Sequence, residues 1–220
     1  MVCKGTGKPE FRLASGPLND DSFKMIFAVV LFAAAVLWRV LLGVSNIHNF
    51  GWMHNFAPLS AVALCGAAFL PRRTAVVLPL FALLLSDLAI NAVYGVPMLS
   101  WEMLARYVAL GGIVVLGLVL RKSPTFGRML GASFAGSIGF YLITNSASWL
   151  TEAGYAKTLS GWVQALTMGL PGYPSTLSFY RSTLISDLLF TALFVVCLRS
   201  AATATATASR PVEAESAARA

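Results

Sequence analysis

The chain has 220 residues, of which 57% are hydrophobic and only 11% charged, and its mean hydropathy is +0.74. A soluble domain usually carries roughly 25% charged residues, so this composition excludes an ordinary water-soluble globule. The net charge of +7 sits in short groups beside apolar stretches and forms no continuous stripe, which argues against a nucleic-acid partner. The composition predicts a multi-pass protein whose main partner is the lipid bilayer.

Six apolar stretches predict an all-α bundle of six transmembrane helices. Residues 1–22 and 199–220 are expected to be disordered tails, because they are rich in small and polar residues. The first apolar stretch lacks a clear cleavage site, so we expect a span there and no signal peptide. The second is short for a bilayer and requires tilt, extension into the preceding loop, or partial shielding by its neighbours. The expected spans are 23–43, 57–70, 74–94, 101–120, 129–149 and 181–198.

The longest loop between the expected spans covers residues 150–180. Leu159, Trp162, Val163 and Leu166 follow the spacing i, i+3, i+4 and i+7, which predicts a short amphipathic helix lying on the membrane. Gly169–Pro174 should end it. Two interpretations stay open for this loop, a lid over a pocket and a plain interfacial connector.

The distribution of lysine and arginine predicts the orientation. Twelve lysines and arginines lie in the two tails and in the turns after the second and fourth spans. Only two lie in the loops after the first, third and fifth spans. Positive residues stay inside, so both termini are expected in the cytoplasm, which requires an even number of spans.

Polar residues within the spans gather, on this topology, in the outer half of the membrane. Asp87, Asn91 and Tyr94 follow the spacing i, i+4 and i+7, and therefore share one helix face. A conduit would need polar groups through the full depth, so the one-sided pattern favours a pocket open to the outer face. Interhelical ion pairs and an interfacial aromatic belt are the structural alternatives. The set comprises Arg39, Asp87, Asn91, Tyr94, Glu102, Arg106, Tyr107, Tyr141, Asn145, Trp149, Arg181, Thr183 and Asp187.

Motifs for common catalytic chemistry do not occur in the sequence. It has no Walker A motif, no G-x-S-x-G and no H-E-x-x-H, so we expect no enzyme and no cofactor. His48 and His54 are six residues apart, a poor spacing for a metal site. Cys3, Cys65 and Cys197 suggest no disulfide framework.

One short motif occurs twice. Leu85-Ser86-Asp87-Leu88 in the third expected span is echoed by Ile185-Ser186-Asp187-Leu188 in the sixth. Two matching halves would suit a duplicated transporter, although so short a motif also recurs by chance.

Several blocks in order carry a resemblance to a known family over residues 37–195. The chain resembles a family of uncharacterised bacterial transport-type proteins (DUF6580-like), which in turn is similar to the substrate-binding (S) components of energy-coupling-factor (ECF) vitamin transporters. The blocks are Asn55-Phe56-Ala57-Pro58-Leu59-Ser60-Ala61, Gly66-Ala67-Ala68-Phe69, Leu78-Pro79-Leu80, Leu85-Ser86-Asp87, Gly131-Ala132-Ser133, residues 140–145 (FYLITN) with Trp149, residues 179–184 (FYRSTL) and Asp187-Leu188.

The resemblance implies a binder in the bacterial inner membrane that captures a small micronutrient, a vitamin or related molecule, from the outer face. A transmembrane coupling protein with two ATPases would complete the transporter. S components dock through Ala-x-x-x-Ala surfaces in their first helix; here such pairs occur in the second span, as Ala57/Ala61 and Ala63/Ala67. Ordinary helix packing is the alternative role of these alanines.

On this hypothesis the ligand meets residues of three kinds. Three arginines would contact its anionic or carbonyl groups, the aspartates and asparagines would form hydrogen bonds, and aromatic residues would pack on its flat parts. An intramembrane enzyme using Asp87 or Asp187 as acid/base, and a structural or assembly subunit, remain the alternatives. The expected binding residues are Arg39, Asn55, Asp87, Asn91, Tyr94, Arg106, Tyr107, Tyr141, Asn145, Trp149, Tyr173, Arg181 and Asp187.

Overall fold

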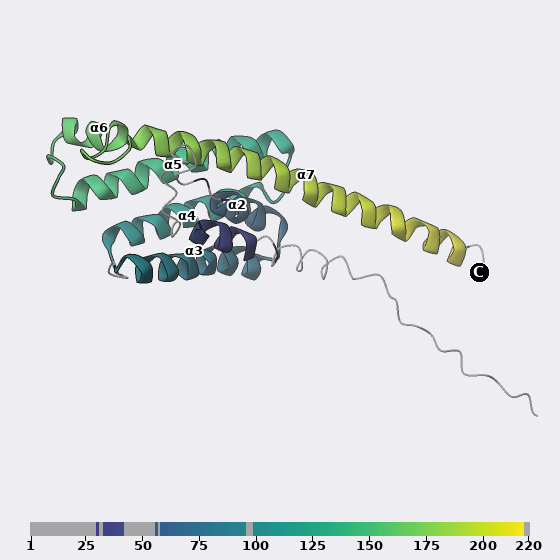
Figure 1. Cartoon of the computed structure of the whole chain (residues 1–220). Coiled ribbons are helices and arrows are strands. Elements are labelled where there is room, and N and C mark those ends of the chain that lie inside the picture. The colour runs from purple at the N-terminus through teal and green to yellow at the C-terminus, as the bar shows by residue number, and fades with distance from the viewer. Residues whose placement is uncertain (1–29, 31–32, 42–55, 57, 96–98, 218–220) are drawn as a thin grey trace, which may run out of the picture.

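Helices of apolar residues, separated by proline and glycine breaks, make up the computed structural model shown in Figure 1. It describes residues 30, 33–41, 56, 58–95 and 99–217, with the backbone alone for Tyr94 and for 198–217. Residues 33–41 are helical. The helices that follow are α2 (Leu59–Phe69), α3 (Arg72–Tyr94), α4 (Trp101–Leu120), α5 (Phe126–Thr151), α6 (Leu159–Thr167) and α7 (Thr176–Ala217).

The helix ends follow local sequence signals. Gly95 ends α3 in the left-handed conformation at φ 64°, which glycine adopts without a steric penalty. The hydroxyls of Ser100 and Thr125 accept hydrogen bonds from backbone amides in the first turns of α4 and α5. The expected break at Gly95 and the short helix over Leu159–Thr167 are both confirmed.

Among the described residues, three helices are long and apolar enough to cross a membrane: Arg72–Val93, Trp101–Leu120 and Thr176–Cys197. They correspond to the expected third, fourth and sixth spans. The fifth is confirmed as a helix, α5, but glycine, serine and threonine make it less apolar. Most of the first expected span lies outside the described residues. The chain is therefore a membrane protein whose described residues form helices and connecting turns.

The short helix α2 lies at the centre of the bundle. It contacts α3, α4, α5 and α7, and nine of its eleven residues are buried. At about 1.5 Å per residue, it is only roughly 16 Å long, about half of the hydrocarbon core of a bilayer. Because the other helices shield it, α2 does not need to reach both membrane surfaces. The shielding explains how a segment too short to span a bilayer can lie inside a membrane protein.

Glycine permits the close approach of α4 to α2. A Cβ atom at Gly117 would lie 2.4 Å from the carbonyl oxygen of Leu64 and 2.6 Å from the Cβ atom of Ala67. The first of these neighbours is backbone and cannot rotate away. By contrast, a Cβ atom at Gly112, on the same helix, would meet nothing within 4 Å.

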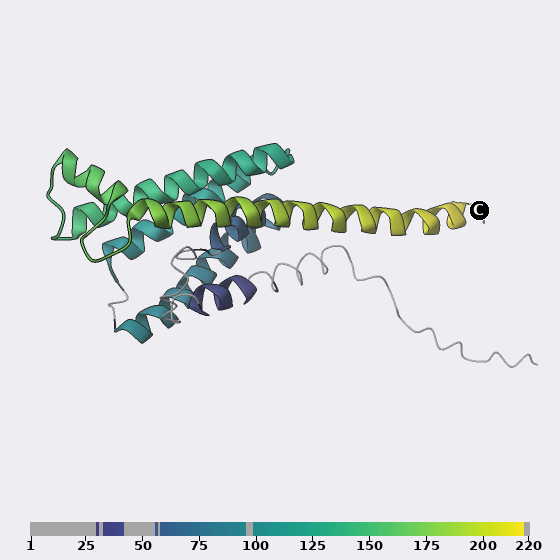
Figure 2. The same ribbon diagram turned by 45° about the horizontal axis from the view of Figure 1, so that its top comes forward.

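Helix α7 extends well beyond the bundle, as Figures 1 and 2 show. It reaches Ala217 and thus includes most of the segment 199–220 for which the sequence predicts a disordered tail. That prediction is corrected by the structure. The physical reason is the alanine content of the segment, since alanine has the highest intrinsic helix propensity.

We predict that Gly117→Ala destabilises the protein by about 1–3 kcal/mol, because the added methyl group forces α2 and α4 apart. Gly112→Ala is the matched control, since it adds the same group to the same helix in open space. Thermal unfolding of both variants in detergent measures the difference. Equal melting temperatures would show that α2 and α4 do not pack this closely.

Candidate functional site

Asp87 lies between two arginines from different helices. Its side chain is buried in the second half of α3. One carboxylate oxygen, Oδ1, accepts a hydrogen bond from Nη2 of Arg39 at 2.6 Å, and Oδ2 lies 3.5 Å from Nη2 of Arg106 on α4. The three residues, here called the arginine cluster, join the helical segment 33–41 to α3 and α4.

Neighbouring contacts position the arginine cluster. The indole of Trp38 donates a hydrogen bond of 2.6 Å to the carbonyl of Phe56, which ties the segment 33–41 to the start of α2. The ring of Phe56 packs edge-on against Phe190 of α7. The first helical segment is therefore held in place just before the residue that binds Asp87.

The arginine cluster retains capacity for further hydrogen bonds. The Nε atoms of Arg39 and Arg106 and the hydroxyl of Tyr107 are buried and have no hydrogen-bond partner among the described residues. The arginine side chains remain 22% and 30% exposed, whereas Asp87 is 3% exposed. Two guanidinium groups against one carboxylate leave an excess of positive charge. Such a group can receive an anion.

The structure brings together only part of the predicted binding set. Arg39, Asp87, Arg106 and Tyr107 form one group. The side chains of Arg181 and Tyr173 are exposed, and Tyr173 lies in the turn before α7. Asn91 is half-buried on α3 and has its own interaction partner.

Two predicted residues bind backbone near the end of α5. The amide of Asn145 donates to the carbonyl of Tyr141, one turn earlier in the same helix, at 2.8 Å. The indole of Trp149 donates to the carbonyl of Ala156 at 2.9 Å. Both polar groups therefore have partners within the fold.

Other predictions fall in part outside the described residues. Asn55, Ala57, His48 and His54 lie there, as does the side chain of Tyr94. The remaining alanines of the expected docking surface, Ala61, Ala63 and Ala67, are at most 1% exposed. In this structure they pack against the chain's own helices, which is the alternative role that the sequence left open.

Asp187, on α7, occupies a different environment. It is 1% exposed, and neither carboxylate oxygen has a hydrogen-bond partner of good geometry among the described residues. The hydroxyls of Ser60 on α2 and Ser137 on α5 lie next to it. Both salt bridges of the described chain go to Asp87 and none to Asp187. The repeated Ser-Asp motif thus places two buried carboxylates in unlike surroundings.

A row of small polar residues lines the contact between α5 and α7. Ser133 and Ser137 are one turn apart on α5, and Asp187 and Thr191 are one turn apart on α7. The hydroxyls of Thr191 and Ser133 are 3.0 Å apart, and all four residues are at most 5% exposed. Sequence analysis missed the serines and Thr191, although Ser133 and Ser137 already showed the spacing i, i+4.

Helix α6 packs on this side of the bundle. It contacts α5 and α7, and the indole of Trp162 donates to the hydroxyl of Ser146 at 2.9 Å. A Cβ atom at Gly161 would clash with the backbone of Ala156. In the preceding turn, burial and the nearby Glu152 carboxylate raise the pKa of Tyr155. The connection between α5 and α7, which includes α6, thus packs against these two helices, and Asp187 lies on α7.

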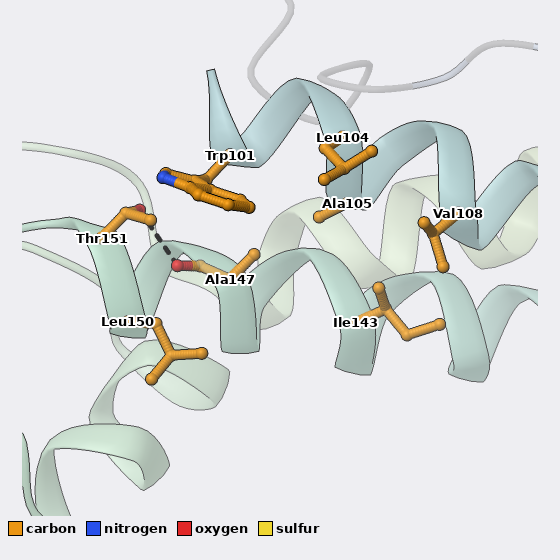
Figure 3. Close-up of a pocket in the computed structure, with 8 residues that line it drawn as sticks. All are labelled: Trp101, Leu104, Ala105, Val108, Ile143, Ala147, Leu150 and Thr151. Atoms are coloured by element: carbon orange, nitrogen blue, oxygen red, sulfur yellow. Dashed lines mark hydrogen bonds between the residues drawn. The ribbon is translucent and has the colours of Figure 1, made fainter.

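An apolar groove of about 440 Å³ lies between α4 and α5 and is drawn in Figure 3. It is lined by Trp101, Leu104, Ala105, Val108, Ile143, Ala147, Leu150 and Thr151. Near its end, the Thr151 hydroxyl donates to Glu102 at 2.8 Å across the two helices. Carbon atoms cover most of its walls, so the groove differs in character from the predicted polar pocket.

The fold and these sites define a class: a helical membrane protein. Its described residues bury two aspartates, of which Asp87 is paired with arginines and Asp187 has no basic partner among them. Comparison with known families identifies it further. The model of the DUF6580 family, a family of unknown function, matches residues 19–209, so the chain belongs to this family. No curated protein and no solved structure matches the chain.

We predict that Asp87→Asn lowers the free energy of unfolding by about 3–5 kcal/mol, because it leaves two arginines without a counter-charge. The triple variant Arg39→Met, Asp87→Leu, Arg106→Met should recover most of the loss, since it removes all three charges together. Denaturant titrations in detergent compare the three proteins. An Asp87→Asn protein as stable as the unmodified chain would contradict a closed ion pair.

Proposed function

We propose that this protein is the substrate-binding subunit of a transporter and captures a small anionic micronutrient at the arginine cluster. The observation that carries the proposal is the unequal charge there: two partly exposed guanidinium groups face one buried carboxylate. The unbonded Nε atoms and the Tyr107 hydroxyl supply donors for a ligand carboxylate, phosphate or carbonyl group. A vitamin or a related molecule with an acidic group fits this chemistry.

The proposal includes an orientation with six spans and both termini in the cytoplasm of a bacterial cell. Its support is the concentration of basic residues at one end of the bundle. Arg72, Arg73, Arg121 and Arg128 lie in or beside the α2–α3 and α4–α5 turns. By the positive-inside rule this end faces the cytoplasm, and the opposite end, with the α3–α4 turn and α6, faces outward. A coupling protein with ATPases would supply the energy for release.

A structural role is the competing function, and a specific observation favours it: the 2.6 Å bond between Arg39 and Asp87 joins two helices whether or not a ligand binds. The two functions differ in one measurable respect. A structural ion pair can be replaced by apolar residues without loss of function, whereas a binding site cannot.

Single cysteines test the orientation. In a chain from which Cys3, Cys65 and Cys197 have been removed, we predict that Ser123→Cys is labelled by an impermeant maleimide only in inverted vesicles. Thr158→Cys should be labelled only in intact cells, because the α4–α5 turn and the α5–α6 connection lie on opposite sides. Labelling of both positions from the same side would overturn the topology.

Thermal shift tests the binding function. Purified protein in choline buffer is exposed to vitamins and nucleotides that carry a carboxylate or phosphate, each paired with its neutral amide or dephosphorylated form. We predict that an anionic member raises the melting temperature, since a ligand at 100 times its Kd stabilises by about 2.7 kcal/mol, and that its neutral form does not.

Two variants locate the effect. Arg106→Gln should abolish the shift, whereas Arg73→Gln, an exposed arginine at the other end of the bundle, should leave it unchanged. If no anion raises the melting temperature of the unmodified protein, the arginine cluster is structural and the transport proposal fails.

A further inference from the structure

We propose that Asp187, Ser60 and Ser137 form a binding site for a small monovalent metal cation, with sodium as the natural candidate. The site lies where α2, α5 and α7 meet, and we call it the Asp187 site. Its carboxylate is distinct from that of the arginine cluster, because Asp187 lies on α7, Asp87 lies on α3, and α3 contacts neither α5 nor α7. The proposal does not depend on what the arginine cluster binds.

The first argument is the state of the buried oxygen atoms. Both carboxylate oxygens of Asp187 and the hydroxyl of Ser137 are buried without a hydrogen-bond partner of good geometry among the described residues, although the hydroxyls of Ser60 and Ser137 lie beside the carboxylate. A buried ion with no partner costs several kcal/mol. One cation held by these oxygens would satisfy all three atoms together. The alternative is a proton on the carboxylate, with hydrogen bonds to the hydroxyls of Ser60 and Ser137.

The second argument is the chemistry of the ligands. Carboxylate and hydroxyl oxygens are hard ligands that suit alkali and alkaline-earth ions. Asp187 is the one carboxylate of the site, and the described residues contain no cluster of three or more His, Cys, Asp or Glu side chains. A single negative charge balances a single positive one, so a monovalent ion fits better than a divalent one.

The third argument is the arrangement of polar groups along the contact between α5 and α7. The helices are antiparallel, and from the α6 end the polar residues follow in order. Tyr141 and Tyr180 come first, with ring centroids 4.5 Å apart, and Ser137 and Asp187 follow. The hydrogen-bonded pair of Ser133 and Thr191 is next.

The row of polar groups then stops. Beyond Thr191 the contact is closed by the buried side chains of Met129, Phe194 and Val195, which are apolar. Within the described part of the chain, polar groups therefore connect the Asp187 site with one end of the bundle only. This suits a site that is loaded from the α6 side and does not suit a channel through the protein.

Titratable neighbours of Asp187 are few. Tyr180 is the titratable group of the described residues that interacts with it, and Tyr141 interacts in turn with Tyr180. The adjoining residue of α2, Ser60, does not titrate. Protonation of Asp187 itself is thus the competing explanation that an experiment has to separate from metal binding.

The test uses the full chain, purified in a sodium-free choline buffer. Sodium chloride is titrated against choline chloride at constant ionic strength, and both the melting temperature and the binding of radioactive sodium are measured. We expect saturable binding and a rise in melting temperature that choline does not produce. Asp187→Asn should abolish both effects.

Milder variants keep the test decisive if Asp187→Asn fails to fold. Ser137→Ala removes one ligand atom and should raise the half-saturating sodium concentration roughly tenfold, the effect of losing one good polar contact. Glu152→Gln is the matched control, because it removes an exposed carboxylate beyond the end of α5 and should leave sodium binding unchanged.

Two results would overturn the proposal. One is the absence of sodium binding, with equal stability in sodium and choline. The other is a stability that is insensitive to sodium in both proteins and that depends on pH in the unmodified chain but not in the Asp187→Asn variant. That result would show that the site binds a proton and not a metal ion. The triple apolar variant of the arginine cluster should still bind sodium, so failure here and failure of the proposed function are distinguishable.

Discussion

The enclosure of α2 by its neighbours is the constraint on which both buried carboxylates depend. A helix of eleven residues is too short to span a bilayer and stays at the centre only because α3, α4, α5 and α7 cover it. Its small residues let these helices approach closely, and Gly117 does the same from α4. Asp87 and Asp187 therefore lie in protein on helices that flank α2, where lipid would otherwise make ionised groups very costly.

The two carboxylates show two responses to the same physical problem. An ion taken out of water needs an opposite charge and hydrogen bonds close by. Asp87 obtains both from Arg39 and Arg106, and the arginines stay partly exposed. Asp187 has two serine hydroxyls as neighbours and no basic side chain in the described chain, although the same Ser-Asp dipeptide places it on its helix. A repeated motif thus fixes the burial of the carboxylate, while the residues of neighbouring helices decide how it is neutralised.

Sequence reasoning found the helices because their signals are local. Apolar stretches, Gly95 and the spacing of Leu159, Trp162 and Val163 gave boundaries close to those of α3, α4 and α6.

Sequence reasoning also selected Arg39, Asp87 and Arg106, since charges inside apolar stretches are conspicuous. It could not pair them, because which helices are neighbours is a property of the whole bundle. Ser60 and Ser137 were overlooked for the same reason, because the role of a serine in a membrane helix depends on the residues that face it in the folded bundle. The helical continuation of α7 was missed because an alanine-rich segment suits both a helix and a low-complexity tail.

The arrangement of contacts limits how events at the two carboxylates can influence one another. Coupling between sites requires an element with two arrangements that both sites can bias. Because α3 touches neither α5 nor α7, no direct contact links the helices that carry Asp87 and Asp187. Among α2–α7, the helices that contact both α3 and α5 are α2, which carries Ser60, and α4, which carries Arg106. The close contact at Gly117 joins these two helices. A shift of α2 against α4 is therefore one movement that could couple a ligand at one carboxylate to the other. The contacts from Trp38 through Phe56 to Phe190 of α7 offer a second route.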